Sequence, residues 1–246
     1  MKNLFGLVGK NIAYSFSKKY FTEKFKEANL PFTYENFDLN KIEDLPVILS
    51  LNHEKLIGFN VTIPYKEAIF TYLDEIDKEA EEIGAVNTVK LVDNFYLKGY
   101  NTDAFGFENS LKPLLKKHHK SALIFGTGGA SKAVKHVLKK LAIPFTVVSR
   151  NPSKNQLSYH DLTTEIIAQN TVLINCTPLG THPNIKDCID IPFQCITPNH
   201  LLYDLIYNPL ETSFLKKGKE KGATIKNGLE MLQLQAEKSW KIWIEN

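Results

Sequence analysis

The chain has 246 residues, of which 43% are hydrophobic, so it is long enough for one large globular domain or two modest ones. Its 30 basic and 27 acidic residues leave a net charge of only +3, which is not the strongly basic balance typical of nucleic-acid binding. No apolar run approaches the roughly 18 residues of a membrane span, and the short stretch Leu4–Gly9 does not predict a signal peptide.

The three cysteines, Cys176, Cys188 and Cys195, all lie in the C-terminal half of the chain. They form no CxxC pair, and no nearby histidine gives the spacing of a zinc site. This pattern predicts buried thiols in a reducing, cytoplasmic environment, with no metal site and no disulfide framework.

The first hundred residues alternate between predicted strands and helices. Strands are predicted at Leu4–Gly9, Phe32–Phe37, Ile57–Thr62, Val86–Val92 and Phe95–Gly99. Helices are predicted at Lys18–Asn29, Lys41–Leu51 and Glu67–Glu82. Asp93-Asn94 separates the last two strands and is a hairpin signal. Together these elements predict an α/β domain with a mostly parallel sheet.

After a connecting helix predicted at Asp103–Lys117, the pattern becomes typical of a Rossmann-type dinucleotide-binding domain. A short apolar strand at Ala122–Phe125 precedes a glycine-rich turn and a helix at Lys132–Leu141. The remaining predicted strands are Phe145–Ser149, Val172–Asn175, Leu201–Leu205 and Ala223–Ile225. The remaining predicted helices are Thr163–Gln169, Thr212–Lys221 and Leu229–Ile244.

The glycine-rich turn is the candidate pyrophosphate site. A turn of this kind lets backbone amides at a helix N-terminus approach a phosphate, and the helix dipole favours the negative charge. The residues predicted to lie at the cofactor here are Gly126, Gly128, Gly129 and Ala130. Ser131 stands where the GxGxxG motif has its third glycine, so a glycine-rich turn without a ligand is the alternative.

The end of the next predicted strand indicates which dinucleotide binds. NAD sites usually place an acidic residue there for the ribose 2′-hydroxyl. This chain has Ser149, Arg150 and Asn151, with Lys154 shortly after. Because a guanidinium binds a 2′-phosphate through charge-assisted hydrogen bonds, we predict NADP(H) as the cofactor. The alternative is that Arg150 is an exposed loop residue without a ligand.

Two polar segments follow strands in the N-terminal half. Lys66 comes shortly after the apolar run that Pro64 ends, and Asp103 closes the segment Asn101-Thr102-Asp103. A lysine after a strand means little alone. This one is a candidate catalytic residue because Asn101-Thr102-Asp103 and then a glycine-rich nucleotide turn follow it in the chain.

These segments fall within eight blocks through which the chain resembles the shikimate 5-dehydrogenase family nearly end to end. In the order of the family, the blocks are Gly9–Ser17, Gly58–Lys66, Gly84–Thr88, Gly99–Asp103, Gly126–Ala133, Asn175–Gly180, Tyr203–Pro209 and Gly228–Ala236. Some residues depart from the family pattern. Asn11, Tyr14 and Lys18 replace a proline, a histidine and a second proline, and Ser149 and Asn151 differ from the residues that usually flank the arginine.

The resemblance implies NADPH-dependent, reversible reduction of 3-dehydroshikimate to shikimate in aromatic amino-acid biosynthesis. It implies Lys66 and Asp103 as the catalytic pair. It places six residues at the substrate: Ser15, Ser17, Thr62, Asn87, Tyr207 and Gln235. It adds Thr177, Leu205 and Gly228 to the cofactor site.

The resemblance also implies two domains: a substrate-binding and catalytic domain at 1–102 plus 229–246, and an NADP-binding Rossmann-type domain at 103–228. Other roles remain open for single residues: Ser17 suits a helix N-cap, Asn87 a turn, Tyr207 a core position, Gln235 an exposed helix position and Asp103 the N-cap of the connecting helix. The alternative functions are a quinate/shikimate dehydrogenase using NAD or NADP, a non-catalytic NADPH-binding regulatory module and a folate-linked dehydrogenase. Monomer and homodimer are both open.

Overall fold

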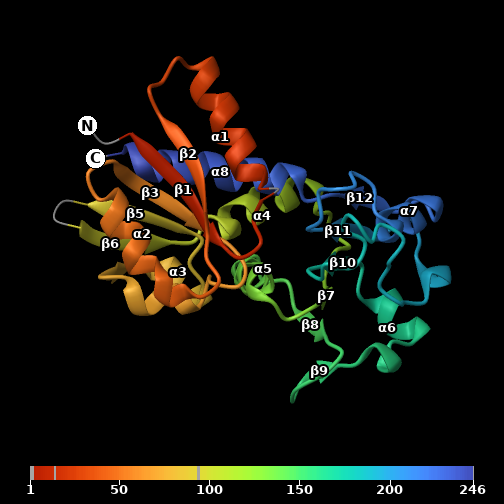
Figure 1. Ribbon diagram of the computed structural model, residues 1–246. Helices are drawn as coiled ribbons and strands as arrows, with labels where there is room; N and C mark the ends of the chain where they lie inside the picture. The colour runs from red at the N-terminus through yellow and green to blue at the C-terminus, as the bar shows by residue number, and fades with distance from the viewer. Residues whose placement is uncertain (1–2, 14, 93–94, 246) are drawn as a thin grey trace. The chain divides into compact units, whose positions relative to one another are not determined.

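The computed structural model describes residues 3–13, 15–92 and 95–245. The chain divides into two compact units, the first formed by Met1–Thr102 with Ala236–Asn246 and the second by Asp103–Gln235 (Figure 1). Residues 229–246 were predicted to belong to the first domain, whereas residues 229–235 group with the second unit. The long C-terminal helix α8 (Leu229–Ile244) therefore contributes to both units.

The first unit is built on a six-stranded sheet. Its strands, in chain order, are β1 (Leu4–Gly9), β2 (Thr33–Asp38), β3 (Leu56–Val61), β4 (Glu75–Ile76), β5 (Thr88–Val92) and β6 (Tyr96–Tyr100). In space the order is β2-β1-β3-β5-β6-β4. The pairs β1/β2, β1/β3 and β4/β6 are parallel, and β5 runs antiparallel to β3 and β6. The predicted mostly parallel sheet is confirmed; Asp93-Asn94 lies outside the described residues.

Both faces of this sheet are buried, which explains why β1 is apolar at nearly every position. Leu4 and Val8 belong to a core that also includes Leu45 of α2 (Leu45–Asn52) and Ala80 of α3 (Lys78–Ile83). Phe5 and Leu7, which alternate with them, pack against α1 (Phe16–Glu27) and the last turns of α8. This second core is an aromatic cluster of Phe5, Phe21, Phe25, Phe32, Tyr34, Trp240 and Trp243.

The prediction of a single helix at Glu67–Glu82 is wrong. The segment forms a short 3-10 turn at Ala68–Tyr72, the edge strand β4 and then α3. Two aspartates explain the break: the Asp74 carboxylate accepts a hydrogen bond from the Leu97 N–H at 2.7 Å, and Asp77 caps α3 by accepting from the Glu79 N–H at 3.1 Å. Pairing of β4 with β6 outweighs the helical propensity of the acidic residues.

The second unit has an entirely parallel sheet. Its strands are β7 (Ala122–Phe125), β8 (Phe145–Val148), β9 (Gln156–Leu157), β10 (Val172–Asn175), β11 (Leu201–Asp204) and β12 (Thr224–Lys226). The spatial order is β12-β11-β10-β7-β8-β9. From β7 the chain first adds strands on one side and then, beginning with β10, on the other. The predicted Rossmann-type fold is confirmed; among the described strands of this sheet, the two-residue edge strand β9 is the one that was not predicted.

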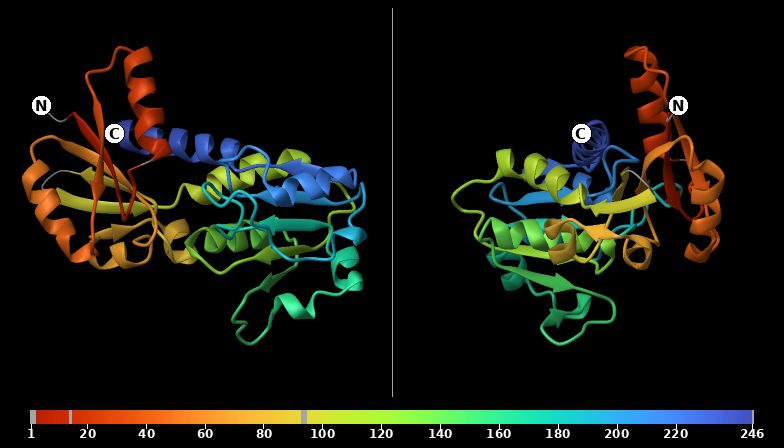
Figure 2. Two further views of the ribbon diagram at one scale, coloured as in Figure 1. Left: turned by 45° about the vertical axis from the view of Figure 1, so that its right-hand side comes forward. Right: turned by 90° about the vertical axis from the view of Figure 1, so that its left-hand side faces the viewer.

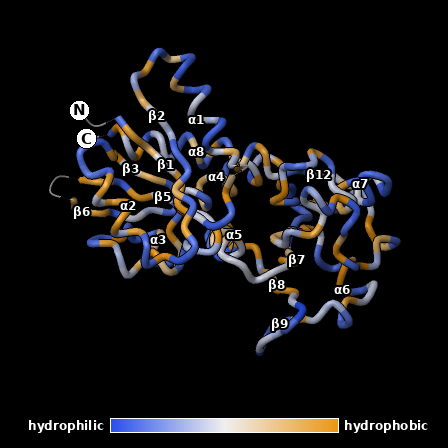
Figure 3. Tube along the Cα trace, viewed as in Figure 1, coloured by the Kyte–Doolittle hydropathy of each residue, from blue (hydrophilic) through white to orange (hydrophobic). Residues whose placement is uncertain are grey.

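Helices cover this second sheet as well. They are α4 (Asp103–Leu111), α5 (Gly129–Lys140), α6 (Thr164–Gln169) and α7 (Ser213–Glu220), which can be followed in Figure 2. Phe107 of α4 packs edge-on against Tyr203 of β11, while Phe214 and Leu215 of α7 join Leu202 in a separate core. Every residue of β7, β10 and β11 is buried, and Figure 3 shows how hydrophobic and hydrophilic stretches alternate along the chain. This burial fixes the carboxyl ends of β7, β10 and β11, from which the candidate cofactor residues extend.

Candidate active site

Lys66 lies in a turn whose backbone is fixed on both sides. The Tyr65 N–H donates to the Thr62 carbonyl at 2.9 Å, and the Val86 N–H donates to the Lys66 carbonyl at 2.8 Å. The buried Tyr65 hydroxyl donates to the Leu39 carbonyl at 2.7 Å. The side chain of Lys66 itself is half-buried. The turn that follows β3 therefore holds the amine on a rigid base.

Thr62 and the segment that follows β1 lie at the same end of the first sheet. The Thr62 N–H donates to the Val8 carbonyl at 2.9 Å. The Asp38 carboxylate, at the end of β2, accepts hydrogen bonds from the N–H groups of Asn11 at 2.8 Å and Ile12 at 3.2 Å. The sheet thus brings Thr62 and the loop toward Ser15 to the carboxyl ends of its parallel strands, where ligands of α/β folds bind.

The departure at Asn11 has a structural explanation. Its φ is +57°, a left-handed conformation that asparagine tolerates and that proline, fixed near −65°, cannot adopt. The loop at this point therefore follows a different backbone path from one that begins with the proline of the family motif. Tyr14, the next departure, lies outside the described residues.

Ser15, not Ser17, caps helix α1. The helix begins at Phe16, two residues before the predicted start, and the Ser15 hydroxyl accepts from the Lys18 N–H at 3.3 Å. The assignment of the cap to Ser17 is therefore wrong. Ser17 lies beside Tyr34. Burial raises the pKa of the Tyr34 hydroxyl, and a hydrogen bond with the Ser17 hydroxyl lowers it by a smaller amount. Both serine hydroxyls thus have local partners in the described structure.

Asn87 is the centre of a buried polar network. It is 3% exposed, its Oδ1 accepts from the Thr102 N–H at 2.7 Å, and its Nδ2 donates to Thr102 Oγ1 at 3.0 Å. The Thr88 hydroxyl joins the network at 2.8 Å from Ser239 Oγ, and Asn60 Nδ2 donates to Ser239 Oγ at 3.0 Å. Four residues of this network were not predicted as site residues: Asn60, Thr88, Thr102 and Ser239. The first three lie inside motif blocks, and that position was the sequence signal that could have found them.

Three predicted residues lie in the second unit: one begins a helix, one lies within a helix and one lies in a loop. Asp103 is the first residue of α4 and is 7% exposed. Gln235 is 6% exposed, packs against Gly106 of α4 and donates to the Leu232 carbonyl at 2.9 Å, so the exposed alternative is wrong. Tyr207 follows β11 and is half-buried, and burial raises the pKa of its hydroxyl.

The glycine turn has the geometry expected of a phosphate site. Gly126 follows β7 with a φ of +102°, and Gly128 is the N-cap of the twelve-residue helix α5, which starts at Gly129. A Cβ atom at Gly128 would meet nothing within 4 Å, so there is open space above the turn. Ser131 replaces the third glycine without disturbing the helix, because its hydroxyl donates to the Gly128 carbonyl at 2.7 Å. Ala130 lies in the first turn of α5.

Arg150 extends from the loop that joins β8 to β9. The loop is held by the Ser149 N–H donating to the Leu157 carbonyl at 2.9 Å and the Asn151 N–H donating to Ser149 Oγ at 3.2 Å. Arg150 and Lys154 are both exposed on it. The two cations therefore follow the strand next to the glycine turn, where the adenosine ribose of a dinucleotide lies.

The remaining predicted cofactor residues lie on the other side of the glycine turn. The Leu205 N–H donates to the Asn175 carbonyl at 3.0 Å, which joins the segments that follow β10 and β11. Thr177 lies in the first of these segments. Gly228 packs directly on Leu205: a Cβ atom there would overlap the Leu205 carbonyl, so this close approach requires glycine.

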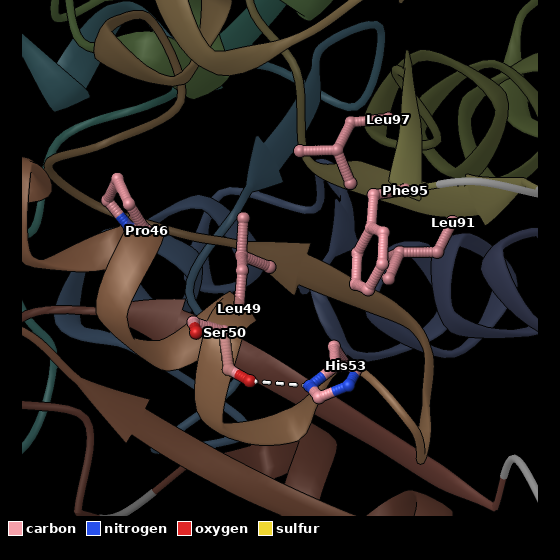
Figure 4. A pocket seen from close by; sticks show the side chains of 7 residues that line it. All are labelled: Pro46, Leu49, Ser50, His53, Leu91, Phe95 and Leu97. Carbon is pink, nitrogen blue, oxygen red and sulfur yellow. Dashed lines mark hydrogen bonds between the residues drawn. The ribbon is translucent and has the colours of Figure 1, made fainter.

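A separate apolar pocket of about 470 Å³ lies in the first unit. Figure 4 shows α2 and the β5–β6 hairpin lining it with Pro46, Leu49, Ser50, His53, Leu91, Phe95 and Leu97. None of these is a predicted site residue. Within the described residues, no group of three or more His, Cys, Asp or Glu side chains is arranged to hold a metal ion. Every helix in the described part of the chain is too short or too polar to cross a membrane.

Comparison with known proteins identifies the relatives of the chain. Residues 7–89 match the profile of the shikimate dehydrogenase substrate binding domain. A protein of Clostridium botulinum named shikimate dehydrogenase (NADP(+)) is 39% identical over 98% of this chain and 96% of its own length.

Solved structures agree with this. The shikimate dehydrogenase of Aquifex aeolicus matches with a TM-score of 0.88 and 35% identity, over 100% of this chain and 93% of that one. The shikimate 5-dehydrogenase of Thermus thermophilus, solved in complex with NADP(H) and shikimate, matches with a TM-score of 0.87 and 30% identity, over 99% of this chain and 94% of that one.

Proposed function

Because the chain belongs to the shikimate dehydrogenase family, we infer that it catalyses the reversible NADPH-dependent reduction of 3-dehydroshikimate to shikimate, a step of aromatic amino-acid biosynthesis. The observation that carries this conclusion is the similarity of nearly the whole chain to relatives named for that activity. The enzyme is an NADP-dependent oxidoreductase that acts on a CH–OH group.

The residues of the second unit fit NADP(H). The open turn at Gly126–Gly129 offers backbone N–H groups and the positive end of the α5 dipole to a pyrophosphate. Arg150, exposed at the end of β8, offers a planar fork of donors to a 2′-phosphate. When bound, the cofactor supplies or accepts the hydride. Ser149, Asn151 and Lys154 shape the loop around Arg150, and Thr177, Leu205 and Gly228 border the other half of the site.

We assign the proton transfer to Lys66. Reduction leaves negative charge on the former carbonyl oxygen, which an ammonium stabilises and protonates; in the oxidation direction the neutral amine takes the proton back. Asp103, at the start of α4, is assigned to hold and orient a substrate hydroxyl as an acceptor.

Six residues are assigned to the substrate. A cyclic polyol acid offers a carboxylate and several hydroxyls, and hydroxyl and amide side chains are matched to both. The serines would donate to the carboxylate, and the others would bond the ring hydroxyls. The set is Ser15, Ser17, Thr62, Asn87, Tyr207 and Gln235. Asn87 has a second task in this assignment, since its amide also fixes Thr102, the residue before Asp103.

The proposed function predicts shikimate-dependent reduction of NADP⁺, measured as growth of the nicotinamide absorbance band. We expect a higher kcat/KM with shikimate than with quinate, and with NADP⁺ than with NAD⁺. Comparable rates on both acids or with both cofactors would instead identify the quinate/shikimate alternative. No absorbance change with any pair, in a protein that still binds NADPH, would indicate the regulatory module.

Ser15 allows its two roles to be separated. Ser15→Ala removes both the cap, which costs about 1 kcal/mol of stability, and a donor to the substrate carboxylate. We expect it to raise the KM for shikimate more than it lowers kcat, as loss of uniform binding does. Ser15→Asp restores the cap but repels a carboxylate, so its KM should exceed that of Ser15→Ala. A wild-type KM for Ser15→Asp would show that Ser15 only caps the helix.

We further propose a reducing, cytoplasmic location, supported by the three cysteines, which are free and half-buried; burial raises the pKa of the Cys176 thiol. The enzyme would work there as a monomer or a homodimer, two states that sedimentation velocity distinguishes by mass.

A further inference from the structure

Asp204, the last residue of β11, is a fully buried carboxylate with no role in the site described above. It is 0% exposed, and burial raises its pKa to about 6. Its Oδ1 accepts from Asn175 Nδ2 at 3.0 Å and from the Ile206 N–H at 3.1 Å, and its Oδ2 accepts from Thr212 Oγ1 at 2.6 Å. Burying a charge is costly, so a carboxylate with three donors at the carboxyl edge of a sheet calls for an explanation.

The bond to Asn175 leads toward the cofactor site. Asn175 ends β10 and pairs in register with Asp204. Its Oδ1 accepts from the Thr177 N–H at 2.9 Å and from Thr177 Oγ1 at 2.7 Å. A Cβ atom on Gly126 would lie 3.0 Å from Thr177 Cγ2, so Thr177 packs on the glycine turn. A chain of contacts therefore runs from Asp204 through Asn175 and Thr177 to Gly126.

The strand order shows which half of the cofactor this chain reaches. The sheet order reverses between β7 and β10, and a dinucleotide lies across that point with its halves on opposite sides. Arg150 follows β8 and marks the adenosine side. The segments after β10 and β11, which follow Asn175 and Asp204, therefore border the nicotinamide side.

We propose that Asp204 is a positioning residue for the nicotinamide half of the cofactor: through Asn175 it holds Thr177 and the segment after β10 against the glycine turn. The role rests on the proposed function, because it presupposes that a dinucleotide binds at this turn. The bond to Thr212 serves a different purpose. Thr212 is the N-cap of α7 and accepts from the Leu215 N–H at 3.3 Å, so this branch anchors a helix and does not lead to the cofactor.

The test compares the binding of NADP⁺ with that of adenosine 2′,5′-bisphosphate, which lacks the nicotinamide half, by titration calorimetry at pH 8. Asp204→Ala should raise the Kd for NADP⁺ by roughly tenfold or more, the scale of a lost hydrogen bond to a charged group, and leave the Kd of the fragment nearly unchanged. Asp204→Asn keeps an oxygen facing Asn175 and should restore NADP⁺ binding. Thr212→Val, which cuts only the branch to α7, is the matched control and should bind both ligands as the wild type does.

Unchanged NADP⁺ binding by Asp204→Ala would overturn the proposal. An equal rise in the Kd of both ligands would also overturn it, because it indicates a general structural role. So would an Asp204→Asn variant whose Kd for NADP⁺ is as high as that of Asp204→Ala. If Asp204→Ala does not fold, Asn175→Ala cuts the same link from the other side, leaves the Thr212 bond in place and carries the same expectations. A wild-type protein that binds neither ligand would refute the proposed function itself, so the two failures are distinguishable.

Discussion

Replacing Lys66 by alanine is expected to lower kcat for shikimate oxidation by roughly 10²–10⁴-fold while the fold remains intact, the usual scale for a lost acid–base group. The fold should survive because the turn is held by its backbone and by Tyr65, and the Lys66 side chain takes no part in those bonds. Steady-state kinetics with NADP⁺ give kcat, and a thermal melt reports folding.

The control for this variant is Lys19→Ala, which removes an exposed lysine of α1 whose ion pair with Glu23 is weak at 3.9 Å. It should match the wild type. Lys66→Arg separates charge from proton transfer, because arginine keeps the charge but does not give up its proton near neutral pH. If Lys66→Arg has a kcat near that of the wild type, Lys66 acts as an orienting cation and not as the proton donor. If the kcat of Lys66→Ala lies within a few-fold of the wild-type value, Lys66 has no part in the mechanism.

Replacing Arg150 by alanine is expected to raise the KM for NADPH by roughly 10–100-fold and to leave the KM for NADH unchanged. The reason is that charge-assisted hydrogen bonds to a 2′-phosphate are each worth about 1.5–3 kcal/mol, and NADH has no such phosphate. Rates with the two reduced cofactors, each at saturating 3-dehydroshikimate, measure the difference.

Lys154→Ala is the matched control for Arg150→Ala, since it removes another exposed cation from the same loop. The lysine ammonium is a point charge and lacks the planar fork of donors of arginine. It should change the KM for NADPH less than Arg150→Ala does. An unchanged KM for NADPH in Arg150→Ala, or a wild type that prefers NADH, would show that the guanidinium does not select the cofactor.

Strongly buried elements were predictable from the sequence because their residue patterns reflect burial directly. The strand Leu4–Gly9 and the helix Leu229–Ile244 were placed to the residue, and both carry side chains of the aromatic cluster. The helix prediction for Glu67–Glu82 failed because the Asp74 carboxylate accepts a hydrogen bond from the backbone of β6. Local helix propensity carries no information about such a long-range contact. The same limitation applies to β9, which exists only through its pairing with β8.

The candidate site shows the same division. Residue types inside motif blocks pointed to Lys66 and the glycine turn, and the position after the next predicted strand pointed to Arg150. What the motifs did not show is which polar side chains serve the fold: Ser15 turned out to be the helix cap, and Asp204 and Asn175 form a buried link that only the register of β10 with β11 creates. A sequence gives the identity of a donor or acceptor, whereas the partner depends on strands far apart in the chain.

The shared helix α8 means that the protein cannot be divided into two working pieces by one break in the polypeptide. A fragment ending at Thr102 would lack Trp243, whose indole donates to the Val89 carbonyl at 3.0 Å, and would leave the rings of Phe5 and Phe21 facing water. To express the first unit alone, its eleven final residues would have to be grafted back through an artificial tether.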